Sequence, residues 1–216
     1  MNRRTVLMLV GLMLFVLGSV ANAATGMYAS RSAWTTDAVT WADVDLTPYV
    51  EFSTLTSVAL PAIAAPATTL TFDVTQEVRQ VPGSWMTWSG GNTPRVLYNG
   101  TEGVTGMFDS AVRGFGLELE PNNFALFDIT LKMADGTSLT NTVDGTSGAA
   151  FFGALSDVGI TGWKAYTSPG SGGFAMGRLV VTGDNPGNGS PELSTWMLLA
   201  CSGLAGLVLR RKTRKT

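Results

Sequence analysis

Apolar and polar residues alternate with a period of two along much of this chain, as they do in β-strands that have one buried face. The clearest example is residues 127–133, where Phe, Ile, Leu and Met alternate with Asp, Thr and Lys. Asp135-Gly136 follows and predicts a type I′ hairpin turn, so residues 138–143 are expected to form the return strand. The pattern therefore predicts antiparallel β structure in this part of the chain.

Four further segments are predicted to be strands: residues 69–78, 115–120, 160–166 and 174–181. The chain between them is rich in Gly, Pro, Asn and Ser, and short strands with such turns are typical of β-sandwiches and barrels. A short helix is expected near Ser32. We therefore predict an all-β domain over residues 24–183. It is expected to be a two-sheet antiparallel β-sandwich with jelly-roll-like topology, flanked by an N-terminal signal helix and a C-terminal transmembrane helix.

The first 23 residues have the features of a secretory signal peptide. Arg3 and Arg4 precede an uncharged apolar run over residues 6–17, and Ala21 and Ala23 are the small residues that signal peptidase reads. A bilayer span needs roughly 20 apolar residues, so a cleaved signal is favoured over a first transmembrane helix. The strongly apolar run favours the general secretory route, and Arg3-Arg4 leaves the twin-arginine route open.

The last residues combine an apolar segment with a cationic end. Residues 196–209 would form a helix about 21 Å long, and Ser194 and Thr195 can extend it toward the bilayer thickness of about 30 Å. Five cations follow: Arg210, Arg211, Lys212, Arg214 and Lys215. Such cations hold their end of a helix in the cytoplasm. We expect a transmembrane helix at 194–209, a basic end at 210–216, and a flexible linker at 184–190. The alternative is a core helix with a basic tail.

This arrangement resembles the PEP-CTERM sorting domain of Gram-negative bacteria. The matching residues within 191–216 are Pro191-Glu192, Ser194-Thr195-Trp196, Leu204-Ala205-Gly206-Leu207 and Arg210-Arg211, and Leu193 stands where the family usually has proline. The resemblance implies that an exosortase, a membrane-embedded cysteine protease or transpeptidase, recognises Pro191, Glu192 and Leu193. It also implies a transient anchor in the inner membrane with the body in the periplasm, followed by transfer to the cell surface or release.

The composition excludes several kinds of chemistry. The chain has no histidine, which excludes a Ser-His-Asp triad, a Cys-His dyad and most zinc sites. Its one cysteine, Cys201, lies in the apolar segment, so the body cannot form a disulfide. Residues 24–190 contain seven Lys and Arg against 15 Asp and Glu, a net charge of −8. An acidic body is poorly suited to nucleic acid, and we expect no nucleic-acid partner.

Glu118 and Glu120 are the first candidate pair for chemistry. Two residues apart on a strand, they point to the same face. A glycosidase needs two carboxylates about 5–10 Å apart, a separation that this spacing allows. The simpler interpretation, which we favour, is a solvated sheet face, so no catalytic residue is predicted.

Trp85 and Trp88 are the candidate contacts for a carbohydrate. They lie in a segment flanked by Gly and Pro, where indoles can form a platform for sugar rings. Three apart on a strand, however, they would face opposite sides. The simpler expectation is therefore one core tryptophan and one half-covered tryptophan in a loop.

Asp43 and Asp45 are the candidate ligands for calcium, which binds six to eight oxygen atoms. The chain lacks the Asp-rich loop of a typical calcium site, so we favour ordinary solvated acids. No metal ligand and no cofactor are predicted, and calcium remains an alternative.

Together these features predict an exported, non-enzymatic protein of the cell surface or extracellular matrix. Its expected partners are signal peptidase, an exosortase, the membrane before processing, and exopolysaccharide. The alternative is a carbohydrate-binding module of the same fold that binds exopolysaccharide. A glycoside hydrolase that uses carboxylates is the third interpretation.

Overall fold

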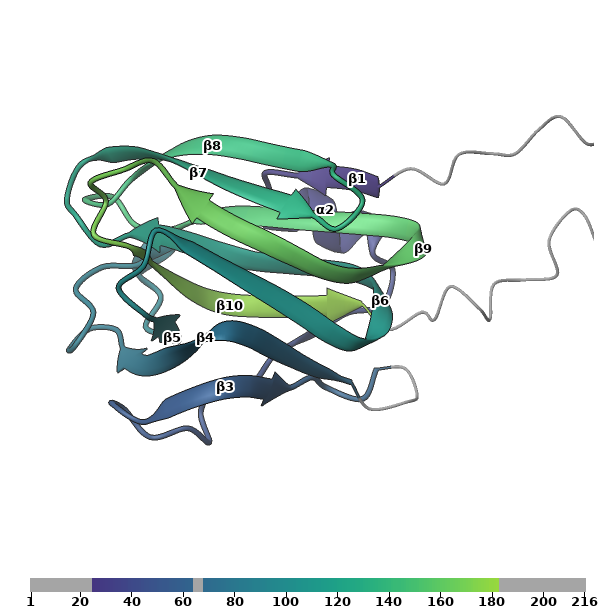
Figure 1. Ribbon diagram of the computed structural model, residues 1–216, viewed down its shortest axis with the longest axis horizontal. Coiled ribbons are helices and arrows are strands. Elements are labelled where there is room, and N and C mark those ends of the chain that lie inside the picture. Colours follow the sequence, from purple (N-terminus) through teal and green to yellow (C-terminus); the bar gives the residue numbers. More distant parts are fainter. Residues whose placement is uncertain (1–24, 64–67, 183–216) are drawn as a thin grey trace, which may run out of the picture.

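The computed structural model describes residues 25–63 and 68–182 (Figure 1). They form ten strands, one α-helix and one 3₁₀-helix. The elements are β1 (Thr25–Tyr28), α2 (Arg31–Asp37), β2 (Ala42–Asp43), β3 (Thr54–Ala59), β4 (Thr69–Gln80), η1 (Ser89–Gly91), β5 (Arg95–Tyr98), β6 (Gly103–Pro121), β7 (Leu126–Met133), β8 (Ser138–Asp144), β9 (Ala150–Thr167) and β10 (Phe174–Thr182). All strand pairings within this region are antiparallel. The prediction of an all-β fold is confirmed.

The predicted strands and the short helix are found where the pattern placed them. The helix α2 begins after Ser30, whose side-chain oxygen accepts a hydrogen bond from the backbone N–H of Ala33 at 3.5 Å. The strands β6 and β9 are longer than expected, at 19 and 18 residues. The predicted signal peptide, linker, transmembrane helix and sorting motif lie outside the described residues.

The long strands β6 and β9 make the fold sandwich- or barrel-like. In its first half β6 lies beside β4, with Leu70 opposite Phe108. In its second half it lies beside β10, with Gly114 opposite Thr182. The pairing of β6 with β9 continues through both halves, across register shifts around Val112. All ten strands therefore belong to one hydrogen-bonded sheet. It bends into two layers, and the longest strands, β6 and β9, take part in both layers (Figure 1).

The main core lies between these layers and is built from the inward faces of the strands. Phe115, Leu117 and Leu119 of β6 are fully buried in one cluster with apolar residues of β4, β7 and β9. The Phe115 ring stacks on Trp163, with 5.4 Å between the ring centroids. A Cβ at Gly106 would lie 2.4 Å from the Trp163 ring, so a glycine is needed there for the indole to enter the core.

The hairpin between β7 and β8 forms as predicted, but its turn type differs. A type I′ turn needs positive φ at both central residues, and only Gly136 has positive φ (93°). The Gly136 N–H donates to the Met133 carbonyl at 2.9 Å, and the Met133 N–H donates to the Thr137 carbonyl at 2.8 Å. The loop thus has three residues and places its glycine last. The Asp135 side chain accepts the Thr137 N–H at 2.8 Å, which holds this conformation.

The first and last described residues lie at the same end of the body (Figure 1). Thr25 pairs with Ser156 of β9, and Gly114 of β6 lies opposite both Leu155 and Thr182. Pro121, at the other end of β6, pairs with Phe174. The loop after Pro121 is therefore at the opposite end from Thr182. In residues 25–63 and 68–182, no helix combines the length and the hydrophobicity needed to cross a membrane.

Candidate functional site

The outward face of β6 carries Gly114, Gly116, Glu118 and Glu120, which alternate with the inward-facing core residues. We expected this face to be solvated, and that expectation is wrong. Glu118 is 4% exposed and Glu120 is 1% exposed. The cause is that α2 and the segment 81–94 lie over the face, with the buried indoles of Trp34, Trp85 and Trp88. We call this covered surface the tryptophan-covered face.

Glycines on β6 and β10 leave room for these large side chains. A Cβ at Gly116 would lie 2.5 Å from the Phe151 ring, and a Cβ at Gly177 would lie 2.7 Å from the Trp88 ring. Contacts this short do not occur without a shift of the neighbouring atoms. The glycines therefore set where the covering layer can approach the sheet, while Glu120 and Glu118 accept hydrogen bonds from the indole N–H groups of Trp85 and Trp88.

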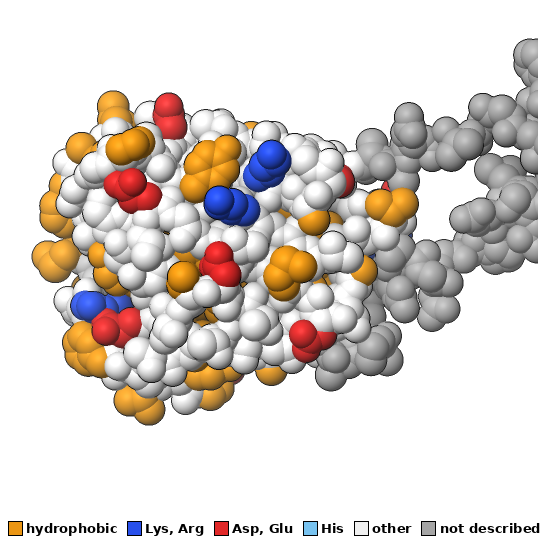
Figure 2. All heavy atoms as spheres, in the orientation of Figure 1, with side chains coloured by type: hydrophobic (Ala, Val, Ile, Leu, Met, Phe, Trp, Pro, Cys, Tyr) orange, Lys and Arg blue, Asp and Glu red, His pale blue; other side chains and the backbone are white. Residues whose placement is uncertain are grey.

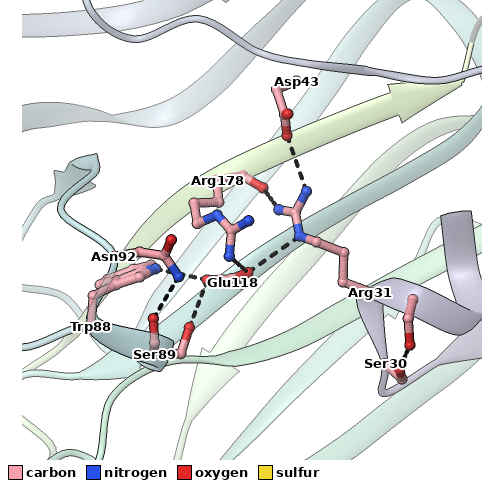
Figure 3. A network of polar contacts seen from close by, with 9 residues as sticks. Ser30, Arg31, Asp43, Trp88, Ser89, Asn92, Glu118 and Arg178 are labelled. Atoms are coloured by element: carbon pink, nitrogen blue, oxygen red, sulfur yellow. Dashed lines mark hydrogen bonds and ion pairs between the residues drawn. The ribbon is translucent and has the colours of Figure 1, made fainter.

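Glu118 lies at the centre of a charged cluster (Figure 3). Its Oε1 accepts hydrogen bonds from Arg31 Nε at 3.2 Å and Arg178 Nη1 at 2.8 Å. Its Oε2 accepts from Trp88 Nε1 at 2.7 Å and Ser89 Oγ at 2.9 Å. Arg31 also forms an ion pair with Asp43 at 3.0 Å. Both oxygens of Glu118 thus have two donors each, and two guanidinium groups compensate its charge.

Arg178 reaches this cluster through an irregularity in β10. Its φ is 45°, which is unusual for a residue other than glycine, and it lies at the register shift between Gly177 and Val180. Such a bulge re-aims a side chain. The Arg178 guanidinium turns toward Glu118, and the backbone carbonyl oxygen of Arg178 accepts a hydrogen bond from Arg31 (Figure 3). The bulge therefore supplies both a guanidinium group and a backbone carbonyl oxygen to the cluster.

Glu120 has a different environment. Its Oε2 accepts a hydrogen bond from Trp85 Nε1 at 3.0 Å, and its Oε1 accepts one from the Thr87 hydroxyl. No ion pair of the described residues includes Glu120. Burial raises the pKa of the Glu120 carboxyl, and the hydrogen bonds from Thr87 and Trp85 oppose the rise. Glu118 is thus paired with two cations, whereas Glu120 accepts hydrogen bonds from neutral groups.

The predicted sugar platform of Trp85 and Trp88 is not supported by the structure. Both rings are buried, and both lie on the same side of the sheet. The expectation of opposite sides was wrong because residues 82–94 form turns and the helix η1 instead of a strand. Each indole is anchored through its N–H to a glutamate, and Trp85 and Trp88 are only 7% and 5% exposed, which leaves little ring surface for stacking.

A hollow opens where the tryptophan-covered face ends, next to the loop after β6. It is lined by Ser84, Trp85, Met86, Thr87, Glu120, Pro121, Asn122 and Phe124. It offers about 60 Å³ to the centres of water-sized groups. Met86 and Phe124 at its rim are 68% and 60% exposed. The sequence prediction missed Met86, Asn122 and Phe124, and the only signal was an aromatic residue in the polar turn Pro121-Asn122-Asn123-Phe124.

The candidate calcium ligands Asp43 and Asp45 have other partners. Asp43 forms the ion pair with Arg31. Asp45 Oδ1 accepts the Thr47 N–H at 2.8 Å, and hydrogen bonds from Thr47 lower the pKa of the Asp45 carboxyl. Within the described part of the chain, no group of three or more Cys, Asp or Glu side chains is placed to hold a metal ion.

Comparison with protein-family models finds no match, and comparison with curated proteins finds none either. Among solved structures, one similar chain is the CBM51 from Clostridium perfringens GH95 in complex with methyl-galactose. It is 10% identical, with a TM-score of 0.28 over 65% of this chain and 100% of that one. Another is the enzymatically active domain of tailspike protein 4 of bacteriophage CBA120. It is 19% identical, with a TM-score of 0.25 over 53% of this chain and 19% of that one. At these TM-scores neither likeness bears on the function of this chain.

Proposed function

We propose that this chain is an exported, non-enzymatic protein of a Gram-negative cell surface or extracellular matrix, sorted by an exosortase. The observation that carries the proposal is the order of features in residues 191–216. Pro191-Glu192 is followed by an apolar segment and then by five cations. The residues before Ala24 supply the matching export signal. The partners in this proposal are signal peptidase, the exosortase and, before processing, the inner membrane.

The geometry of the body agrees with this proposal. Thr25 and Thr182 leave the fold at one end, so a tail held in a membrane would leave the loop after Pro121 on the far side of the body (Figure 1). The hollow beside that loop would then face away from the membrane. A surface protein presents its binding groups in this direction.

The buried state of Glu118 and Glu120 supports a non-enzymatic role. A glycoside hydrolase needs one carboxyl group to protonate the leaving oxygen and another to attack or to activate water. Both oxygens of Glu118 are taken by protein donors, and Glu120 is bound to Trp85 and Thr87. A hydrolase would have to use other carboxylates.

The mass of the mature protein from its native host tests the sorting proposal. We expect a chain that begins at Ala24 and lacks the apolar segment and the basic end. Glu192→Ala should block the C-terminal processing, whereas Asp184→Ala, which removes an acid from the linker, should leave it unchanged. Deletion of residues 196–216 should give a soluble secreted body. Normal processing of the Glu192→Ala variant would refute the sorting assignment.

Carbohydrate binding at the hollow is a second candidate function. The observation that favours it is that two exposed apolar residues, Met86 and Phe124, line the hollow together with the polar residues Asn122, Thr87 and Ser84. Carbohydrates are bound by such a combination, because their C–H faces pack on aromatic rings while their hydroxyls form hydrogen bonds. A glycan array with the full-length protein tests it, and the absence of binding at micromolar affinity to any polysaccharide would remove it.

A further inference from the structure

The two buried carboxylates of β6 differ in the compensation of their charge. Glu118 contacts the guanidinium groups of Arg31 and Arg178. Glu120 is even less exposed, at 1%, yet only a neutral indole and a neutral hydroxyl contact it. A buried charge is costly unless it is paired. Within the described residues the positive partner that Glu118 has is therefore missing at Glu120.

The hollow is the side from which an outside group can approach Glu120. Glu120, Thr87 and Asn122 are among the residues that line the hollow. A volume of about 60 Å³ is enough for several water-sized groups, since one needs roughly 10–15 Å³ by this measure. It is too small for a sugar ring. An ammonium group or a hydroxyl fits inside, while the rest of a ligand would lie against the rim.

The residues at the rim of the hollow and the net charge of the body indicate what kind of ligand the hollow would bind. Phe124 and Met86 offer apolar contact, and an aromatic face also attracts a cation. Hydrophobic side chains are visible at the end of the body away from the start of β1 and the end of β10, on the left of the view (Figure 2). Residues 24–190 carry a net charge of −8, which attracts a cationic polymer.

We propose that the hollow binds an amino sugar unit of a surface polysaccharide. The ammonium group enters the hollow and pairs with Glu120, and the ring packs its C–H face on Phe124. The proposal rests on the second candidate function and specifies its ligand. A neutral sugar would leave the charge of Glu120 uncompensated, whereas an amino sugar supplies the cation that Arg31 and Arg178 supply to Glu118.

Isothermal titration calorimetry on the full-length protein in a mild non-ionic detergent tests the proposal. The probes are a glucosamine trisaccharide, its N-acetylated counterpart and trilysine, all near pH 6, where the amines are charged. We expect the glucosamine trisaccharide to bind at least about tenfold more tightly than the acetylated one, as for one charge-assisted hydrogen bond. Trilysine, which has the charge but no sugar ring, should bind more weakly than the amino sugar.

Three variants complete the test. Glu120→Gln and Phe124→Ala should each weaken binding of the glucosamine trisaccharide by about tenfold or more. Phe52→Ala is the matched control, because Phe52 is a similarly exposed phenylalanine that does not line the hollow. Phe124→Ala changes a rim residue that is 60% exposed, so it keeps the test valid if Glu120→Gln fails to fold.

The possible results separate this proposal from the function on which it rests. Equal binding of the acetylated and free trisaccharides, both weakened by Phe124→Ala, would overturn the ammonium assignment and leave carbohydrate binding intact. Trilysine binding as tightly as the amino sugar would show that the hollow recognises a cation without a sugar. Binding of neither trisaccharide, with no glycan bound on an array, would remove both the ligand and the carbohydrate function.

Discussion

Glutamine substitution should destabilise the fold at Glu118 and have little effect on stability at Glu120. At Glu118, four donors converge: two guanidinium N–H groups on Oε1, and the Trp88 indole and Ser89 hydroxyl on Oε2. A glutamine has one acceptor oxygen and one NH₂ group, which only donates. Whichever way the amide of Glu118→Gln is turned, its NH₂ meets either the guanidinium groups or the indole N–H. At least one buried donor then loses its acceptor.

At Glu120 the amide fits. The Trp85 indole can donate to the amide oxygen, and the Thr87 hydroxyl, which can rotate, can accept from the NH₂ group. The Thr87 hydroxyl also lies 3.4 Å from the Gly145 carbonyl, so it has a second acceptor for its own proton. Glu120→Gln additionally removes a buried charge that has no positive partner.

The magnitude follows from these contacts. Removing one partner of a buried ion pair costs roughly 3–5 kcal/mol. The side chains of Arg31 and Arg178 are 17% and 33% exposed, so water recovers part of the loss. We expect Glu118→Gln to lower the free energy of unfolding by about 2–3 kcal/mol. For a domain of this size that is a fall in Tm of roughly 4–12 °C. Glu120→Gln should stay within about 1 kcal/mol of the wild type, or be more stable.

Urea unfolding of the full-length protein in a mild detergent measures both variants. Tryptophan fluorescence is a suitable signal because Trp34, Trp85, Trp88 and Trp163 are buried and become exposed on unfolding. Circular dichroism before the titration confirms that each variant is folded. Equal stabilities for the two variants, or a greater loss for Glu120→Gln, would refute the assignment of compensated and uncompensated carboxylates.

Three further predictions follow from the same structure. Because burial raises the pKa of Glu120 above its ordinary value of 4.5, the folded state holds this proton more tightly. Its contribution to stability is complete below pH 4.5 and is lost as the pH rises through the folded pKa. Denaturation curves between pH 4 and 7 should therefore show Glu120→Gln gaining on the wild type, and a constant difference would contradict this. Gly106→Ala should cost about 1–3 kcal/mol by calorimetry, because its Cβ would lie 2.4 Å from Trp163. Gly26→Ala, with 3.5 Å to its nearest neighbour, should cost less than half as much, and equal costs would contradict the packing argument. Trp34→Phe should lower Tm by several degrees, because it removes a buried indole and its hydrogen bond at 3.0 Å. An unchanged Tm would show that α2 contributes little.

The sequence located most of the strands by local patterns. Alternation predicted the strand at 127–133, the Asp135-Gly136 turn predicted its return strand, and Ser30 caps the short helix that was expected near Ser32. It did not determine the turn between β7 and β8. Asp-Gly is compatible with more than one turn, and the contacts of the Asp135 side chain with Thr137 and with the distant Thr25 accompany the longer loop.

The candidate site depended on tertiary structure, because a period of two shows that a strand has two faces but not what covers each one. The composition excluded histidine chemistry, and the spacing placed Glu118 and Glu120 on one face. What covers that face comes from far along the chain: Trp85 lies 35 residues from Glu120, and Arg178 lies 60 residues from Glu118. Only the folded chain brings these groups together, so only the structure could decide that one carboxylate is compensated and the other is not.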